Sequence, residues 1–412
     1  MRILHLNTQA SGGSYEYAAQ LCVALSEEAI ESRILTRDSQ QPRGSGSLLD
    51  RVIRRGYVSV STAPWHGTWR LLSPPASEQL QQIDVVHLHT VADWFDVPGW
   101  LETLPRRMGV VISIHDMWHI TGGCFLYRGC DRYTSETGAC DSCPILTWPA
   151  NRLLANAAYA RKFRAYRNSG ARMVANSYWL AELAGRSAIA QACGGVRVIP
   201  PGIHTTVFKP QDKELCRQQL GLPADAFVVA TGGASLKDTN KNVPWLLKQL
   251  SLLPDLGRVI VLALGEGTVP VPKGLNVRFL SYVRDRCELA RLLAAADIFV
   301  SASLMETYGL TLIEAMACGT PVVAFRAGGI PEAAGDGQGA MLCRPQDGAA
   351  LLEAIIKLRK SPQLREELGG IAHETVHSRN VPGLFARKFA QLYRECLDPN
   401  PTIPAVTSAT VT

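Results

Sequence analysis

The chain contains the stretch Asp297-Ile-Phe-Val-Ser-Ala-Ser-Leu-Met-Glu306-Thr-Tyr-Gly-Leu-Thr-Leu-Ile-Glu314-Ala-Met-Ala-Cys-Gly319-Thr-Pro-Val-Val-Ala-Phe325, which predicts a strand, a helix and a second strand in succession. Its apolar beginning, as far as Ser301, is typical of a buried strand. Gly319 is expected to cap the helix, and the apolar residues that follow Pro321 form the next strand. Such a unit is typical of a parallel sheet covered by helices.

Two carboxylates lie around the start of that predicted helix. Glu306 falls in the strand-to-helix loop and Glu314 falls inside the helix. The free amides from Gly309 to Leu312 predict an anion site, because the first turn of a helix has backbone N–H groups without partners. Carboxylates repel phosphate but accept hydrogen bonds from hydroxyls. The combination suits a nucleotide joined to a sugar.

The run from Glu306 to Ala324, with its Gly-Leu, Ala-Met-Ala and Gly-Thr-Pro context, resembles the donor-sugar motif of retaining GT-B glycosyltransferases of family 4. The resemblance implies an α/β fold with two Rossmann-like domains, whose parallel sheets face each other across a deep interdomain cleft. It implies that Glu314 binds the ribose of a nucleotide sugar and that Glu306 binds hydroxyls of the donor sugar. The other donor-binding residues implied here are Tyr308, Gly309, Leu310 and Thr311.

Length and composition favour two α/β domains. The 412 residues exceed what a single core usually holds, and an apolar fraction of 47% is ample for burial. The net charge of +6 is too diffuse to indicate nucleic acid as a partner, and no nucleic-acid motif accompanies it. No apolar run is long enough to span a bilayer. We therefore expect a cytoplasmic protein, or one that is peripheral on the inner face of the cytoplasmic membrane.

Strand-like and helix-like runs alternate in two series, one from Arg2 and one from near Phe227. The Pro- and Gly-containing stretch between them resembles the family's connector, with Pro201 and His204 in place of the usual Asn and Asp. By the resemblance, the last helix crosses back to the first domain. The predicted organisation is an N-terminal acceptor-side domain at 1–200 with a Cys-rich loop at 121–144, a connector at 201–211, a nucleotide-sugar-binding domain at 212–381, a crossing helix at 382–396 and a disordered tail at 397–412.

Two loops of the first domain are predicted to contribute to the site. Gly12 and Gly13 follow the first strand, where glycines let backbone amides approach a diphosphate; a plain tight turn is the alternative. They match the family's first-domain loop. His115 ends another strand, beyond which ligands bind in open parallel sheets. The family has a histidine there that contacts the donor sugar, so His115 is predicted to be catalytic, whereas His87 and His89 are interpreted as structural or peripheral.

In the second domain, Lys237 and Lys241 lie in the loop after the first strand, where cations would offset charge on a leaving diphosphate. The family generally has an arginine followed by a lysine. Lys241 matches the lysine, but the arginine is missing and Lys237 is a candidate substitute without the planar two-pronged contact of arginine. Val283 is implied to pack near the nucleobase, in a turn whose backbone contacts do not distinguish UDP from GDP.

Four of the eleven cysteines form a cluster, Cys124, Cys130, Cys140 and Cys143, that ends in a Cys-x-x-Cys. Thr121-Gly-Gly-Cys124 and this cluster resemble a subset of the family found in exopolysaccharide and colanic-acid-type clusters. Two interpretations stay open, a structural zinc held by four thiolates or four free thiols. The other seven cysteines are predicted to be buried single thiols, and no disulfides are expected.

Two basic segments bear on a membrane partner. Gly44 to Pro75 combines arginines with tryptophans, as at a bilayer interface, although a solvated insertion is the preferred interpretation. Asn151 to Arg167 predicts a helix with a positive side, which either approaches lipid-linked substrate or is an ordinary surface helix. The mild positive charge is compatible with association with an anionic inner-membrane surface.

The predicted reaction transfers a sugar from a UDP- or GDP-sugar to a hydroxyl of a growing, lipid-linked exopolysaccharide or other glycan, with retention of configuration. By the resemblance, the leaving phosphate takes the acceptor proton, so Glu306 is not a glycosidase-like nucleophile. His115, Glu306 and Lys241 are assigned to the catalytic set, and no cofactor or metal is expected for catalysis. The alternative is an inactive or epimerase-like GT-B protein that binds sugar nucleotide without transfer.

Overall fold

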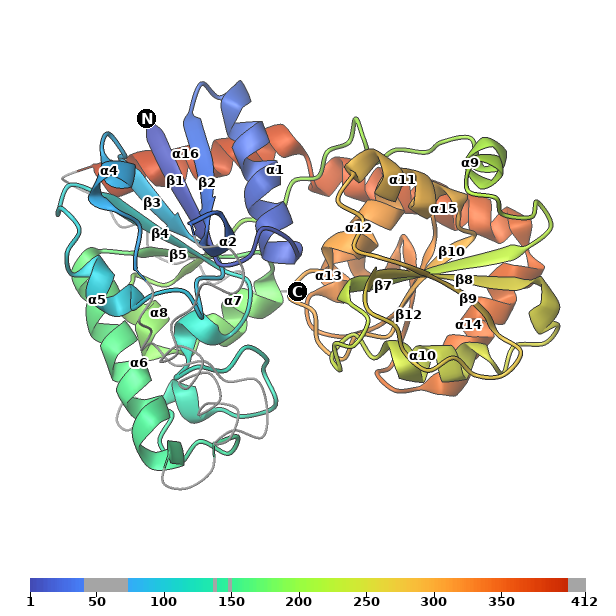
Figure 1. The fold of residues 1–412 in the computed structure, drawn as a ribbon, viewed down its shortest axis with the longest axis horizontal. Coiled ribbons are helices and arrows are strands. Elements are labelled where there is room, and N and C mark those ends of the chain that lie inside the picture. Colours follow the sequence, from blue (N-terminus) through green and yellow to red (C-terminus); the bar gives the residue numbers. More distant parts are fainter. Residues whose placement is uncertain (41–72, 136–138, 147–149, 399–412) are drawn as a thin grey trace. The chain divides into compact units, whose positions relative to one another are not determined.

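The computed structural model describes residues 1–40, 73–135, 139–146 and 150–398. The chain divides into two compact units, and Figure 1 labels most of their elements. Unit 1 comprises Met1–Ala10, Ser14–Ile199 and Phe385–Thr412, and unit 2 comprises Ser11–Gly13 and Pro200–Leu384. The predicted tail and the basic segment from Gly44 to Pro75 lie almost wholly outside the described residues.

Unit 1 is built on a parallel six-stranded sheet in the order β2-β1-β3-β4-β5-β6. Its strands are β1 Arg2–Asn7, β2 Glu31–Thr36, β3 Val85–Leu88, β4 Gly109–Ile114, β5 Arg172–Ala175 and β6 Val196–Val198. Its helices are α1 Gly13–Glu27, α2 Arg37–Gln40, α4 Ser77–Leu80, α5 Val97–Leu101, α6 Ala150–Ser169, α7 Tyr178–Gly185, α8 Ala188–Ala192 and α16 Pro382–Leu397, the last belonging to unit 1 from Phe385 onward.

The two faces of this sheet differ in chemistry, because successive side chains of a strand point to opposite faces. One face places Leu4, Val86 and their neighbours in a hydrophobic core. The opposite face carries His5 and His87, both fully buried. Tyr393 of α16 lies within 2.7 Å of His87 through its hydroxyl. Both faces are therefore covered, as in other parallel sheets, but one buried face is partly polar, with His5 and His87 beside Ile3 and Val85.

Unit 2 is built on a second parallel six-stranded sheet, in the order β12-β11-β10-β7-β8-β9. Its strands are β7 Phe227–Ser235, β8 Val259–Glu266, β9 Asn276–Leu280, β10 Ile298–Ser301, β11 Val322–Phe325 and β12 Ala340–Cys343. Its helices are α9 Lys213–Gln219, α10 Val243–Leu250, α11 Arg286–Ala295, α12 Leu310–Ala317, α13 Ile330–Ala333, α14 Gly348–Lys360 and α15 Pro362–Arg379.

The chain order of the strands reverses once in each sheet. The reversal lies between β1 and β3 in unit 1 and between β7 and β10 in unit 2. At such a point the connections leave for opposite faces of the sheet, and ligands of α/β proteins bind beyond the strand ends there. The predicted strand, helix and strand are confirmed as β10, α12 and β11, with Glu306 in the loop and Glu314 in the helix.

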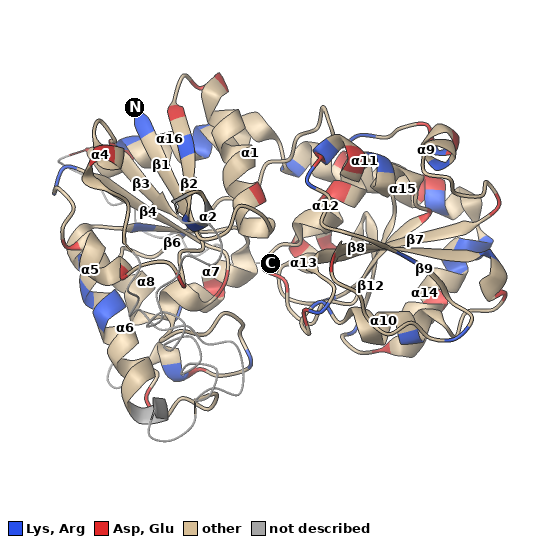
Figure 2. Ribbon diagram, viewed as in Figure 1, with Lys and Arg blue, Asp and Glu red and all other residues tan. Residues whose placement is uncertain are grey.

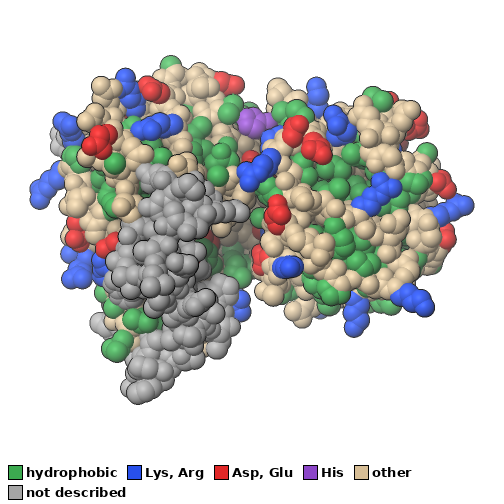
Figure 3. Space-filling model, in the orientation of Figure 1, with side chains coloured by type: hydrophobic (Ala, Val, Ile, Leu, Met, Phe, Trp, Pro, Cys, Tyr) green, Lys and Arg blue, Asp and Glu red, His purple; other side chains and the backbone are tan. Residues whose placement is uncertain are grey.

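Charged residues of both signs are distributed over both units (Figure 2). The face drawn in Figure 3 likewise shows Lys, Arg, Asp and Glu side chains interspersed. Such mixing is typical of a solvated surface rather than of a nucleic-acid-binding stripe. No helix within the described residues is long and apolar enough to span a membrane.

A buried ion pair anchors β10 to the rest of unit 2. Asp297, which precedes β10, accepts hydrogen bonds from Arg217 Nη2 at 2.6 Å and from the Val228 backbone N–H at 2.8 Å. The Asp297 and Arg217 side chains are only 6% and 8% exposed. Lys213 and Arg365 add cations at 3.5 and 3.6 Å from the same carboxylate.

Asp297→Asn is expected to lower the free energy of unfolding by about 3 kcal/mol, because it leaves the Arg217 guanidinium buried without its counter-charge. The measurement is denaturant unfolding followed by circular dichroism. Glu31→Gln is the control, because it removes one partner of the exposed Arg2–Glu31 pair and should cost no more than about 1 kcal/mol. Equal small effects of both substitutions would contradict the anchoring role of Asp297.

Candidate functional site

The loops after β7 and β10 meet at the strand-order reversal of unit 2. There Lys241 donates to Glu306 in an ion pair. Two hydrogen bonds also join the loops, since the Asn240 side-chain Nδ2 donates to the Met305 carbonyl at 2.7 Å and the Leu304 backbone N–H donates to the Asn240 carbonyl at 2.9 Å. The structure therefore brings together the two unit 2 residues that were predicted to be catalytic.

Burial and charge act in opposite directions on Lys241. Burial by itself lowers the pKa of this lysine, but the Glu306 carboxylate and its hydrogen bond raise the pKa above its ordinary value. The lysine stem fits because position 233 is glycine, where an added Cβ would lie 3.0 Å from Lys241 Cε. Lys241 is thus protonated near neutral pH.

The start of α12 presents fewer free amides than the sequence predicts. Gly309 is the N-cap in the left-handed region at φ 94°, a conformation that favours glycine. The Leu312 N–H donates to the Gly309 carbonyl at 3.0 Å, so Leu312 is not part of the anion site. Leu310 and Thr311, both partly exposed, supply the first-turn amides.

Tyr308 lies inside unit 2 rather than on a donor-facing surface. It is 2% exposed, and its hydroxyl accepts a hydrogen bond from Asn380 Nδ2 at 2.9 Å. Burial raises the pKa of Tyr308 to about 12. This residue packs beneath the loop that carries Glu306 and would act on a ligand by positioning that loop.

Glu314 forms an ion pair with Arg286, a residue that the sequence did not single out. Arg286 begins α11, whose N-cap Asp285 accepts hydrogen bonds from the Cys287 and Glu288 backbone N–H groups. The Glu314 side chain is 3% exposed and that of Arg286 is 20% exposed. A ligand hydroxyl can therefore reach this carboxylate only after a neighbouring side chain moves. Asp285 in the sequence could predict the start of this helix, but no sequence pattern predicts that Arg286 pairs with Glu314.

The remaining predicted donor-binding residues are not joined to Lys241 or Glu306 by the contacts described above. Lys237 is exposed in the turn after β7 and forms no ion pair with any described residue. Val283 is partly buried and packs against the core of unit 2. Gly12 adopts φ 90°, and Gly13 is the first residue of α1, so the double glycine does form the turn between β1 and this helix.

In unit 1, three histidines form a hydrogen-bonded chain at the other strand-order reversal. His115 Nε2 lies 2.9 Å from His89 Nδ1, and His89 Nε2 lies 3.0 Å from His5 Nδ1. The contact joins His115, predicted to be catalytic, directly to His89, interpreted as structural or peripheral. Burial lowers the pKa of His115 and of His5 to about 3, and that of His89 well below its ordinary range. The chain is therefore neutral at pH 7.

The unpartnered nitrogen of His5, at one end of the histidine chain, favours one set of tautomers. His5 Nε2 is buried without a hydrogen-bond partner. A neutral imidazole has one N–H and one lone pair, and buried N–H groups without acceptors are the rarer kind of unpaired group. The favoured arrangement has His5 donating to His89 and His89 donating to His115. His115 then accepts at Nε2 and carries its own proton on Nδ1.

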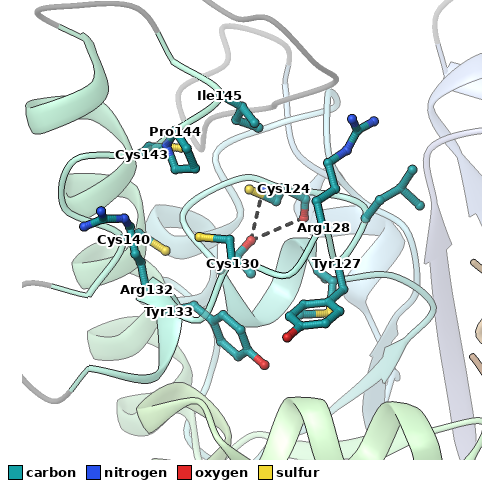
Figure 4. Close-up of a pocket in the computed structure, with 13 residues that line it drawn as sticks. Cys124, Tyr127, Arg128, Cys130, Arg132, Tyr133, Cys140, Cys143, Pro144 and Ile145 are labelled. Atoms are coloured by element: carbon teal, nitrogen blue, oxygen red, sulfur yellow. Dashed lines mark hydrogen bonds between the residues drawn. The ribbon is translucent and has the colours of Figure 1, made fainter.

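The four clustered cysteines line a cavity of about 210 Å³ in unit 1 (Figure 4). None of the eleven cysteines, all within the described residues, forms a disulfide. Cys287 is exposed, which corrects the prediction that the single cysteines are all buried. It is exposed because it lies in the first turn of α11, next to the N-cap Asp285.

Comparison with known proteins assigns a family description to each half of the chain. Residues 11–207 match the family model described as glycosyltransferase family 4, and residues 226–361 match the model described as group 1 glycosyl transferases. The chain carries two glycosyltransferase domains. A relative, the D-inositol 3-phosphate glycosyltransferase of Stackebrandtia nassauensis, is 34% identical over 196 residues, which cover 43% of this chain and 44% of the relative. The chain thus spans about half the length of the curated relatives it matches.

Solved structures share the fold of these glycosyltransferase domains. The sucrose-phosphate synthase of Thermosynechococcus elongatus aligns with a TM-score of 0.63 at 21% identity, over 96% of this chain and 98% of the synthase. Anabaena HepE, solved in complex with UDP and glucose, aligns with a TM-score of 0.61 at 19% identity, over 96% of this chain and 99% of HepE. The expected two-domain α/β architecture of GT-B type is confirmed.

We expect His115 to be neutral from pH 5 to pH 8, with its proton on Nδ1, because burial lowers its pKa and His89 donates to Nε2. Two-bond ¹⁵N–¹H correlation spectra of histidine-labelled protein report both the charge and the tautomer. His89→Gln, which alters the donor to Nε2, should redistribute the proton between the two ring nitrogens. A His115 that titrates with a midpoint near 6.5, or that carries its proton on Nε2 in the wild type, would contradict this assignment.

Proposed function

We propose that this chain is a retaining glycosyltransferase that moves a sugar from a nucleotide-diphosphate sugar to a hydroxyl of a growing, lipid-linked glycan such as an exopolysaccharide. The observation that carries the proposal is the Lys241–Glu306 pair at the strand-order reversal of unit 2. One member suits a phosphate and the other suits sugar hydroxyls, and they lie beside the first turn of α12. The two glycosyltransferase domain matches and the UDP bound by HepE support a nucleotide-sugar donor.

The side chains of unit 2 suggest how a donor would be held. The Lys241 ammonium and the Leu310 and Thr311 amides would bind the diphosphate and stabilise the negative charge that develops as it leaves. Glu306, paired with Lys241, would accept hydrogen bonds from donor-sugar hydroxyls. Arg286 keeps a positive charge next to Glu314, the proposed ribose-binding carboxylate, so that this buried group is not left unpaired when no ligand is bound.

By the family resemblance, His115 would orient the donor sugar. Its neutral ring can donate from Nδ1 without repelling the positive charge that develops at the anomeric carbon. In the proposed front-face reaction the C–O bond to the leaving diphosphate breaks, the acceptor oxygen bonds to the anomeric carbon on the same face, and the leaving phosphate takes the acceptor proton. We propose no catalytic metal, since residues 212–412 contain no Asp-x-Asp motif.

The acceptor is the least constrained part of the proposal. The relative in Stackebrandtia nassauensis is named for inositol 3-phosphate, whereas the Cys-rich loop resembles transferases of exopolysaccharide clusters. A lipid-linked acceptor would place the enzyme on the inner face of the cytoplasmic membrane. The decisive assay incubates the full chain with UDP- and GDP-sugars and either lipid-linked saccharides or inositol 3-phosphate, and measures hydrolysis, transfer and anomeric configuration.

Transfer with retention to a lipid-linked saccharide is the expected result. Transfer to inositol 3-phosphate alone would replace the proposed lipid-linked acceptor by the one named for the relatives, while the proposal for the donor would stand. Donor binding without turnover on any acceptor would overturn the transferase proposal in favour of a protein that only binds sugar nucleotide. Interconversion of donors without an acceptor would favour the epimerase-like alternative.

Substitutions separate the proposed roles of the two carboxylates. Glu306→Gln should lower kcat by about 100-fold or more with little change in donor affinity, because its contacts strengthen as the sugar reacts. Glu314→Ala should raise the donor Kd about 10-fold or more, which corresponds to about 1.4 kcal/mol. Glu366→Ala, at an exposed position of α15, is the matched control and should leave both constants unchanged. Wild-type behaviour of both test variants would contradict the assignment.

A further inference from the structure

Four cysteines surround one cavity of unit 1, apart from the residues assigned to sugar transfer. Cys124 follows the turn after Trp118–Ile120, Cys130 precedes Arg132–Thr134, and Cys140 and Cys143 form the Cys-x-x-Cys. All four line the same cavity of about 210 Å³. Figure 4 shows their side chains distributed around it. Residues far apart in this loop are thus brought to one place by the fold.

The cysteines act on one another, and one of them receives a hydrogen bond from the backbone. The Cys124 thiol lies within hydrogen-bonding reach of Cys143, and Cys130 and Cys140 are close enough to act on it electrostatically. The Gly122 N–H donates to Cys140 Sγ at 3.2 Å. Backbone donors of this kind stabilise and orient thiolate ligands.

We propose that Cys124, Cys130, Cys140 and Cys143 bind one structural zinc ion as a tetrathiolate. Binding replaces four thiol protons by one Zn²⁺, so four protons are released and the site changes from neutral to a charge of −2. Four sulfur ligands fill the tetrahedral sphere of zinc and leave no position for substrate, so the site is structural. Positive φ angles of 58° at Cys140 and 52° at Ser142 fold the Cys-x-x-Cys into a tight turn.

Cations near the cavity match the charge of such a site. Arg128 and Arg132 line it, and Arg132 acts on Cys143 electrostatically. Lys162 of α6 is fully buried, acts on Cys140, and donates to the Trp118 and Thr121 carbonyls, but burial lowers its pKa, so the two arginines carry most of the positive charge. A buried dianion is tolerated only where such positive groups compensate it. Lys162 also fixes the loop to α6 before any ion is bound.

The described part of this loop contains little regular secondary structure to hold it in place. Its described residues 121–135 and 139–146 contain one 3-10 turn, Arg132–Thr134, and otherwise turns, bends and single bridge positions. Few backbone hydrogen bonds therefore hold it in place. A zinc ion joining three points of the loop would fix a segment that begins six residues after His115.

One other group in the described chain competes for the role. The ligand atoms of His5, His87 and His89 all lie within 4.8 Å of one another, whereas the four sulfurs form no such compact group, so the proposal requires the cysteine side chains to move toward one another when zinc binds. Both ring nitrogens of His87 and of His89, and His5 Nδ1, already have hydrogen-bond partners, which leaves His5 Nε2 as the one unpartnered nitrogen of this group. We therefore assign the ion to the cysteines.

The test is elemental analysis of the full chain, purified through a tag that binds no metal. We expect about one zinc per chain, loss of more than nine tenths of it in Cys130→Ser/Cys143→Ser, and retention in the control Cys287→Ser. In the wild type, cobalt substitution should give sulfur-to-metal charge-transfer absorption and the visible bands of a tetrahedral site. A thiol-specific mercurial should release the metal even if the double variant fails to fold.

Several results would overturn the proposal. These are wild-type protein without zinc, zinc that a mercurial does not release, and a Cys124–Cys143 disulfide found by mass spectrometry in protein kept under reducing conditions. Zinc that survives Cys130→Ser/Cys143→Ser but is lost in His5→Gln/His87→Gln would assign the ion to the histidines. None of these outcomes depends on sugar transfer, so the zinc proposal and the proposed function stand or fall separately.

Discussion

The reversal of strand order between β7 and β10 is the constraint on which the proposed donor half depends. Two neighbouring parallel strands end at the same edge, yet their connections leave for opposite faces of the sheet, and the chain cannot fill the space between them. Lys241 and Glu306 occupy this space from either side. The same constraint operates between β1 and β3, where His5 and His89 lie. The polar groups of each unit therefore collect where the topology provides room.

The sequence predicts the parts of this arrangement that depend on local pattern. Glu306 could be placed in a loop and Glu314 in a helix, because apolar runs, Gly309 and Gly319 delimit the elements between them. The pairing of Glu314 with Arg286 could not be predicted, since it depends on how α11 packs beside α12. Likewise, the strands of His5 and His87 were predictable, but their register, which sets these two residues opposite each other, is a tertiary property.

The two predicted donor-binding carboxylates of unit 2 are both held in ion pairs. Glu306 and Glu314 are each neutralised by a cation from a different element, Lys241 and Arg286. A pair of this kind lets a site keep charged groups out of water without leaving any of them uncompensated. Binding of a nucleotide sugar would exchange partners rather than create new charges, because phosphate can replace a carboxylate beside a cation and hydroxyls can replace the cation beside a carboxylate.

Because α16 lies near the end of the described chain, the completion of unit 1 depends on the order of synthesis. Unit 2 is essentially one continuous stretch of chain, whereas the histidine-bearing face of unit 1, which Tyr17 of α1 contacts at His89 and His115, receives Phe389 and Tyr393 only after nearly all the rest of the described chain has been made. Tyr393, fully buried against His87, is among the last described residues to leave the ribosome. Domains usually fold in the order of their synthesis. In this chain the α16 part of unit 1 is synthesised after all of unit 2, so unit 1 lacks this helix while unit 2 is being made.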